Sequence, residues 1–177
     1  MKQSKLQKMV LTALLAACSW ALSTVLVFPN MAPMQHFINV IAAVLLGPWW
    51  ALACAAMTGF MRMLLGGRTL LSVIGAVFGA LLAGLLYRWS KKVIWAVIGE
   101  IIGTGIISAI VAVPVMKAVY GLPDASTFMY VPFFIPSAAA GASLGFLFLG
   151  ALDRTRVLAW MGFGRLFGVG RNKELSQ

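Results

Sequence analysis

Long stretches without a charged side chain follow one another along this sequence. The first covers residues 10–28, and further apolar stretches, separated by short basic or Gly/Pro-containing segments, continue to residue 152. A helix needs about 20 consecutive apolar residues to cross the hydrocarbon core of a bilayer. Of the 177 residues, 62% are hydrophobic and 10% are charged, whereas a soluble domain is about half apolar and a quarter charged. The sequence therefore predicts an all-α integral membrane protein.

The positive charges lie at the borders of the apolar stretches. The formal net charge of +10 could also suit a nucleic-acid-binding protein. However, eleven of the 14 basic residues fall in the N-terminus, in one short loop or in the C-terminal tail: Lys2, Lys5, Lys8, Arg88, Lys91, Lys92, Arg154, Arg156, Arg165, Arg171 and Lys173. Short cytoplasmic segments of membrane proteins carry such an excess of positive charge. We therefore expect both termini and the 88–92 loop in the cytoplasm, and no binding of nucleic acid.

The first apolar stretch could be a signal peptide or a membrane span. A signal peptide has a basic start followed by an apolar core of about 7–15 residues and a small-residue cleavage site. Here the apolar stretch is longer, and it ends Val25-Leu26-Val27-Phe28 without such a site. We interpret it as the first span.

The number of spans follows from where the basic segments lie. If the N-terminus and the 88–92 loop are both cytoplasmic, the chain crosses the membrane an even number of times between them. Gly47-Pro48 interrupts the middle stretch, so we interpret that stretch as two short spans joined by a tight turn. We expect one domain with six spans, at about residues 9–28, 36–49, 51–65, 69–87, 93–116 and 129–151, and a basic tail at 153–177. Residues 160–169 of this tail are expected along the inner membrane surface.

Signatures of enzymes and of metal sites are absent from the sequence. No Gly-x-x-x-x-Gly-Lys-Ser/Thr motif for ATP hydrolysis occurs. Ser137 and His36 could formally supply a serine-protease dyad, but no Gly-x-Ser-x-Gly turn surrounds Ser137. Cys18 and Cys54 lie inside apolar stretches without the partners that a zinc site needs. We expect no catalytic residues, no metal and no cofactor, and keep an intramembrane enzyme as the minor alternative.

Polar side chains gather where the second span begins. Gln35, His36 and Asn39 can share one helix face because they are three and four residues apart, and His36 is the single histidine of the chain. Tyr130 and Ser137 lie at the same predicted outer side. These residues either solvate the helix ends or form a small-molecule site that opens to the outside. We predict the second.

Arg62 and Glu100 are the charges set within apolar stretches. A charge in hydrocarbon is costly and usually faces a partner or a cavity. Arg62 lies near the outer end of its span and could extend toward water. Glu100 lies about seven residues, or about 10 Å, from the inner end of its span, so the two charges are expected in different halves of the membrane. Ligand contact, an ion pair and a helix-interface role remain open for both, and we include both among the candidate substrate-binding residues.

Alanines recur at every fourth position of the first span. Ala13, Ala17 and Ala21 therefore form one stripe of the helix, and small residues at this spacing allow another helix to approach closely. The approaching helix could belong to this chain or to a partner protein.

Three segments, in this order, resemble the ThiW family. They read PMQHFINVIAAVLLGPWWA, GFMRMLLGGRTLLSVIGAVFGALLAGLLY and GEIIGTGIISAIVAVPV, and the resemblance covers roughly residues 8–152. The family belongs to the substrate-binding S components of energy-coupling factor (ECF) transporters. The resemblance implies an S-component-like bundle of six helices in the plasma membrane of a prokaryotic cell, with cytoplasmic termini and a vitamin site near the outer face.

The same resemblance implies a substrate and partners. The substrate would be hydroxyethylthiazole, the thiazole precursor of thiamine, with another thiamine-related or unrelated vitamin as the alternative. The partners would be a transmembrane T component and two ATP-hydrolysing subunits. The stripe of Ala13, Ala17 and Ala21 is similar to the small-residue motif by which S components dock on the T component.

Overall fold

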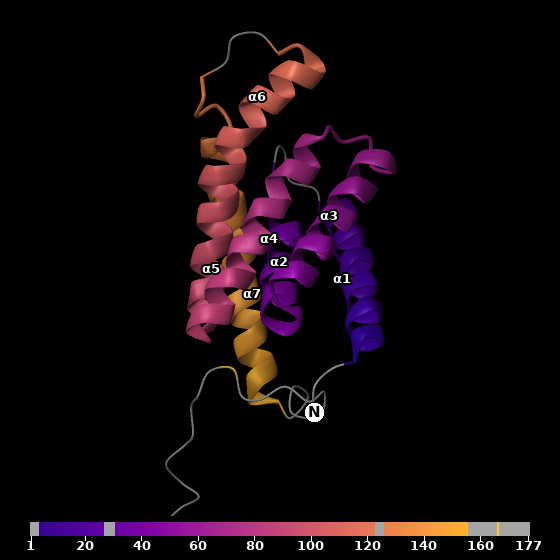
Figure 1. Cartoon of the computed structure of the whole chain (residues 1–177), viewed down its shortest axis with the longest axis vertical. Coiled ribbons are helices and arrows are strands. Elements are labelled where there is room, and N and C mark those ends of the chain that lie inside the picture. The colour runs from indigo at the N-terminus through magenta and orange to yellow at the C-terminus, as the bar shows by residue number, and fades with distance from the viewer. Residues whose placement is uncertain (1–3, 27–30, 123–125, 156–165, 167–177) are drawn as a thin grey trace, which may run out of the picture.

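A computed structural model describes residues 4–26, 31–122, 126–155 and 166, and every element in it is a helix. The helices are α1 (Lys5–Val25), α2 (Pro33–Leu46), α3 (Pro48–Leu64), α4 (Leu71–Ser90), α5 (Val93–Ile102), the π-helix η1 (Gly103–Ser108), α6 (Ala109–Tyr120) and α7 (Val131–Arg154). They stand side by side in a bundle (Figure 1). The prediction of an α-helical membrane protein is confirmed.

The bundle contains both long and short helices. Four are long and apolar enough to cross a membrane: α1, α4, α7 and the continuous helix of 28 residues formed by α5, η1 and α6. The other two, α2 with 14 residues and α3 with 17, are shorter. Each of the six ranges predicted as spans thus contains a helix. Only four of these helices, however, are long and apolar enough to cross a membrane by themselves. The expected tail at 153–177 lies almost wholly outside the described residues, as does its 160–169 segment.

The first helix begins earlier than predicted because its N-terminus is capped. The Ser4 side chain accepts a hydrogen bond from the backbone N–H of Gln7 at 3.1 Å. The Gln7 side chain in turn accepts one from the backbone N–H of Ser4 at 2.9 Å. This reciprocal pair is a capping box, and it starts α1 at Lys5 rather than near residue 9.

The break between α2 and α3 lies at Gly47-Pro48, as the sequence predicts. Gly47 has φ of +87°, in the region that glycine adopts without steric cost. Pro48 follows as the first residue of α3, where its missing N–H costs no helical hydrogen bond. The turn reverses the chain, and both short helices therefore lie within the bundle.

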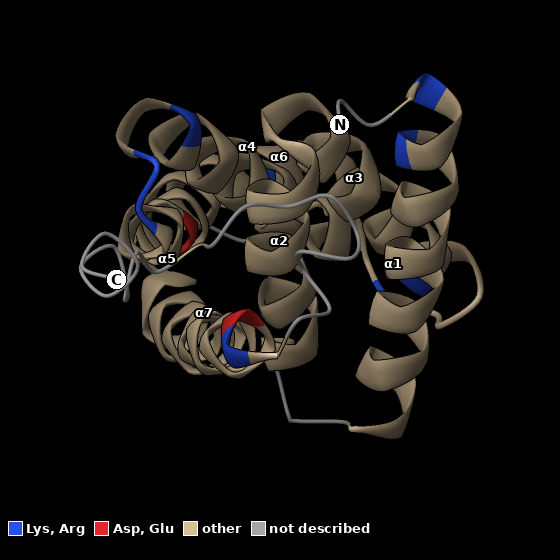
Figure 2. Ribbon diagram, turned by 90° about the horizontal axis from the view of Figure 1, so that it is seen from below, with Lys and Arg blue, Asp and Glu red and all other residues tan. Residues whose placement is uncertain are grey.

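α2 occupies the centre of the bundle and α1 its edge. Twelve of the 14 residues of α2 are buried, and Figure 2 shows α2 between α1, α3 and α7. In α1 the buried residues are Thr12, Ala16 and Ser19. The alanine stripe lies on another side of this helix, because Ala13, Ala17 and Ala21 are all exposed.

Glycines allow α4 and α5 to pack backbone against backbone. A Cβ added to Gly99 would lie 2.7 Å from the Cα of Ala83, and one added to Gly103 would lie 2.7 Å from the Cα of Gly79. Neither position has room for a side chain. This close approach places the middle of the α5–η1 segment directly beside α4.

Three groups of basic residues near helix termini gather at one end of the bundle. Lys5 and Lys8 lie in the first turns of α1, Arg88, Lys91 and Lys92 lie where α4 passes into α5, and Arg154 ends α7. Figure 2 shows these blue segments from that end. The starts of α2, α4 and α7 lie at the opposite end (Figure 1).

Replacing Gly103 by Ala should destabilise the protein. The new methyl group would meet the backbone of α4, which cannot move without separating the two helices, and such overpacking costs about 1–3 kcal/mol. Thermal unfolding of the purified protein measures the effect. Gly75→Ala is the matched control, because its Cβ would meet only the ring edge of Phe134, at 3.2 and 3.3 Å. Equal melting temperatures for both variants would contradict this packing.

Candidate functional site

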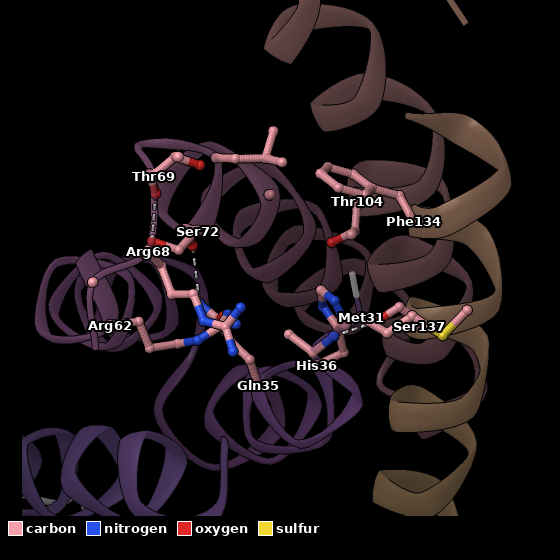
Figure 3. Close-up of a pocket in the computed structure, with 14 residues that line it drawn as sticks. Met31, Gln35, His36, Arg62, Arg68, Thr69, Ser72, Thr104, Phe134 and Ser137 are labelled. Atoms are coloured by element: carbon pink, nitrogen blue, oxygen red, sulfur yellow. Dashed lines mark hydrogen bonds between the residues drawn. The ribbon is translucent and has the colours of Figure 1, made fainter. Parts of the chain in front are cut away.

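A cavity of about 300 Å³ lies at the end of the bundle away from the basic residues of the α1 start, the α4–α5 connection and the α7 end. Its walls come from the segment before α2 and the first turn of α2, the end of α3, the 67–69 connection, the start of α4, η1 and the start of α7 (Figure 3). The lining residues are Met31, Ala32, Gln35, His36, Arg62, Gly67, Arg68, Thr69, Leu71, Ser72, Gly75, Thr104, Phe134 and Ser137. Segments far apart in the sequence thus line one space with both polar and apolar side chains.

A buried carboxylate fixes the histidine of this cavity. The Nδ1 of His36 lies 2.8 Å from the Oε1 of Glu100. The same oxygen accepts hydrogen bonds from the Nδ2 of Asn39 at 2.9 Å and from the Oγ1 of Thr104 at 3.1 Å. Because Nδ1 is held by Glu100, Nε2 is the ring nitrogen that remains available to a ligand.

Local sequence makes room for this network. A Cβ at Gly79 of α4 would lie 2.1 Å from the Oγ1 of Thr104 and 2.8 Å from the Oε1 of Glu100, so glycine is required there. Thr104 belongs to the π-helical η1, a type of helix that is rare and frequent at functional sites. Asn39 also donates to the backbone oxygen of Ala76 at 3.3 Å, which links α2 to α4.

A second polar group forms the opposite wall. The guanidinium of Arg62 donates to the side-chain oxygen of Gln35. The Nε2 of Gln35 donates to the backbone oxygen of Ser72 at 3.4 Å. Figure 3 shows the side chains of Arg62 and Arg68 both extending toward Gln35. Arg62 thus has a neutral partner, and the Arg62–Glu100 pair considered from the sequence does not form.

Ser137 and Tyr130, near the start of α7, both contact other residues of the protein. The Oγ of Ser137 accepts a hydrogen bond from the backbone N–H of Ala32 at 2.8 Å, which ties the segment before α2 to α7. The ring of Tyr130 stacks on that of Phe134, with the ring centroids 5.8 Å apart. The imidazole of His36 contacts Glu100 rather than Ser137, so the formal Ser–His dyad is not assembled.

The predicted site residues fall into two groups. Gln35, His36, Arg62 and Ser137 line the cavity, whereas Asn39, Glu100 and Tyr130 do not. Glu100 was expected in the other half of the membrane from Arg62, and the two do not pair. The same depth argument also separated Glu100 from the start of α2, which is wrong, because its carboxylate contacts His36 and Asn39 directly. The depth argument failed because α2 has only 14 residues, so its polar start lies deep enough in the bundle to reach the middle of the α5–η1 segment. Ligand contact by these residues stays a prediction.

Sequence reasoning missed other residues of the cavity. Arg68, Thr69 and Ser72 line the wall beside Arg62, and none of them was among the predicted site residues. Thr104 could have been found from its position four residues after Glu100 on the same helix face. Phe134, 9% exposed, carries no signal that separates it from the other apolar residues of its span.

In the part of the chain that the structure describes, no three His, Cys, Asp or Glu side chains gather as metal ligands do. The cavity instead offers hydrogen-bond donors and acceptors together with one aromatic ring. Such a lining suits the binding and orientation of a small polar molecule.

Removing the carboxylate of Glu100 should strongly destabilise the protein. Three buried donors would lose their common acceptor, and breaking a buried pair by removing one partner costs about 3–5 kcal/mol. Thr104→Val, which removes a single neutral hydrogen bond, should cost about 1 kcal/mol. Thermal unfolding should therefore rank wild type, Thr104→Val and Glu100→Ala in order of falling stability. A Glu100→Ala protein as stable as wild type would contradict the role given to this carboxylate.

Comparison with known proteins gives one match. Residues 9–155 match the family described as thiamine-precursor transporter protein (ThiW). No curated protein and no solved structure matches the chain. The family match covers most of the sequence and every helix that contributes to the cavity, and the chain therefore belongs to the ThiW family of thiamine-precursor transporter proteins.

Proposed function

We propose that this chain is the substrate-binding S component of an ECF transporter and that it takes up hydroxyethylthiazole through the cavity around His36. The observation that carries the proposal is a cavity of about 300 Å³ with both polar and apolar lining residues in a chain of a thiamine-precursor transporter family. Binding pockets for small molecules start at about this volume, so the cavity suits one compact ligand.

The distribution of charge supports an outward-facing cavity. The basic residues of α1, of the α4–α5 connection and of the end of α7 lie at the end of the bundle away from the cavity (Figures 1 and 2). Positive residues favour the cytoplasmic side. In the proposed arrangement all six helical segments cross the plasma membrane of a prokaryotic cell, the termini are cytoplasmic and the cavity opens to the outside. The short α2 is accommodated by its burial among the other helices.

The chemistry of the cavity suits a thiazole that carries a hydroxyethyl group. The ring nitrogen is an acceptor and can receive a hydrogen bond from Arg62, and the hydroxyl can donate to the Nε2 of a neutral His36. Phe134 offers an aromatic surface to the ring. Because Glu100 holds the imidazole from behind, His36 would lose little conformational freedom when the ligand binds.

Transport against a gradient requires energy from partner proteins in this proposal. The sequence has no nucleotide-binding motif, so a T component and two ATP-hydrolysing subunits would supply it. The exposed stripe of Ala13, Ala17 and Ala21 supports a docking role, since small residues let a partner helix approach α1 closely.

Purified protein should bind hydroxyethylthiazole, and His36→Ala should weaken this binding. Loss of one buried hydrogen bond costs about 1–3 kcal/mol, or roughly a 5- to 150-fold loss of affinity. Isothermal titration measures the affinity, and Thr24→Ala on the exposed face of α1 is the control. Tight binding of riboflavin or another unrelated vitamin, with none of the thiazole, would overturn the proposed substrate. Turnover of the ligand by the isolated chain would overturn the transporter role.

Replacing Ala17 by Leu should block assembly with the T component and uptake into cells. The added side chain would project from the exposed stripe and keep the partner helix at a distance. Binding of the thiazole by the isolated chain should stay intact, because Ala17 lies outside the cavity. Co-purification and uptake assays measure the two effects, with Cys18→Leu, also exposed on α1, as the control. Collapse of ligand binding in Ala17→Leu would show instead that the stripe packs within the chain.

A further inference from the structure

The charged side chains that line the cavity are both positive. Arg62 and Arg68 belong to the lining, and no Asp or Glu does. Neither arginine has a carboxylate partner in the described part of the chain, where the salt bridge found is that of His36 and Glu100. Arg62 donates to the neutral amide of Gln35, which satisfies a donor without balancing its charge.

Glu100 does not compensate for these charges within the cavity. Its carboxylate is fully buried behind the lining, and the oxygen that has partners is occupied by His36, Asn39 and Thr104. The two arginines lie on the other wall, beside Gln35 (Figure 3). A partly buried guanidinium without a counter-charge is costly in a membrane, and an anion in the cavity would offset that cost.

Helix termini add to the positive potential. α2 begins at Pro33, α4 at Leu71 and α7 at Val131, and residues of the first two turns of each helix line the cavity. The N-terminus of a helix carries about half a positive charge. Three such termini around one cavity favour an anionic group there, in addition to the two arginines.

We propose that the preferred ligand of this cavity carries an anionic substituent, a carboxylate or a phosphate monoester, that binds between Arg62 and Arg68. This rests on the proposed function, because it takes the cavity as the substrate site of a thiazole transporter. Guanidinium groups bind carboxylate and phosphate through paired, charge-assisted hydrogen bonds. The anionic group then lies toward the 67–69 connection and the thiazole ring toward His36 and Phe134, which is the reverse of the orientation described above for the neutral alcohol.

Three thiazoles test the inference: hydroxyethylthiazole, its phosphate monoester and the matching thiazole acetate. Their affinities for the purified full-length protein are measured by isothermal titration. Hydrogen bonds to charged groups predict that at least one anionic compound binds roughly 10- to 150-fold more tightly than the neutral alcohol. Which of the two does so identifies the anionic group. Added salt should reduce the advantage.

Variants of the two arginines test whether these side chains cause the tighter binding of the anionic compounds. In Arg68→Gln, at an exposed loop position, the ratio of anionic to neutral affinity should fall toward one. Arg62→Lys keeps the charge of this half-buried position and should reduce the ratio less. Arg88→Gln, an exposed residue at the opposite end of the bundle, should leave the ratio at its wild-type value.

Three results would overturn the inference, and they are distinguishable. If the neutral alcohol binds as tightly as both anions, the anionic preference is wrong and the proposed function stands. If none of the three compounds binds, the proposed function fails and the inference fails with it. An anionic advantage that persists undiminished in Arg68→Gln would also contradict the assignment to this pair.

Discussion

One carboxylate oxygen, the Oε1 of Glu100, joins the two helices that matter most for the site. This oxygen is fully buried, and it is hydrogen-bonded to the side chains of His36 and Asn39 from α2 and of Thr104 from η1. α4 contributes the space at Gly79 and the backbone oxygen that binds Asn39. A buried charge is tolerable only when it is paired and hydrogen-bonded. The position of α2 relative to α4 and η1 is therefore coupled to this one residue, and so is the orientation of the imidazole in the cavity.

The short hairpin of α2 and α3 determines which side chains line the cavity. Because α2 is only 14 residues long and central, its polar first turn lies inside the bundle rather than in water. α3 returns the chain to the same end and brings Arg62 opposite that turn. The cavity thus has a neutral hydrogen-bonding wall around His36 and a positively charged wall around Arg62 and Arg68. This asymmetry can orient a ligand that has a ring at one end and a polar substituent at the other.

Hydrophobic patterning was enough to predict the class of protein and the approximate position of each helix. Polar groups in apolar stretches seek partners or cavities, and four of the residues predicted on this ground, Gln35, His36, Arg62 and Ser137, line one cavity. Their contact with a ligand stays a prediction. Depth counted along separate helices could not predict the contact of Glu100 with His36. That contact depends on how deep a short helix sits, and on glycines such as Gly79 that let neighbouring backbones meet.

Arg68 shows a further limit of sequence reasoning. A basic residue after two glycines reads as a solvated loop, and only the turn of the chain between α3 and α4 brings it to the cavity wall. The π-helix is similar, because the sequence Gly-Thr-Gly at its start does not by itself distinguish it from a flexible α-helix. Both features arise from tertiary packing rather than from local propensity.

Ligand protection of a cysteine at the cavity wall tests the central claim most directly. Thr69→Cys is made in a protein whose Cys18 and Cys54 are replaced, with Lys91→Cys at the opposite end as the reference. A membrane-impermeant maleimide should label position 69 from outside the cell and position 91 only from inside. Saturating hydroxyethylthiazole or its anionic analogue should slow the labelling of position 69 and leave position 91 unaffected. Labelling of position 69 from the cytoplasm, or at a rate that no thiazole changes, would contradict an outward-facing substrate cavity.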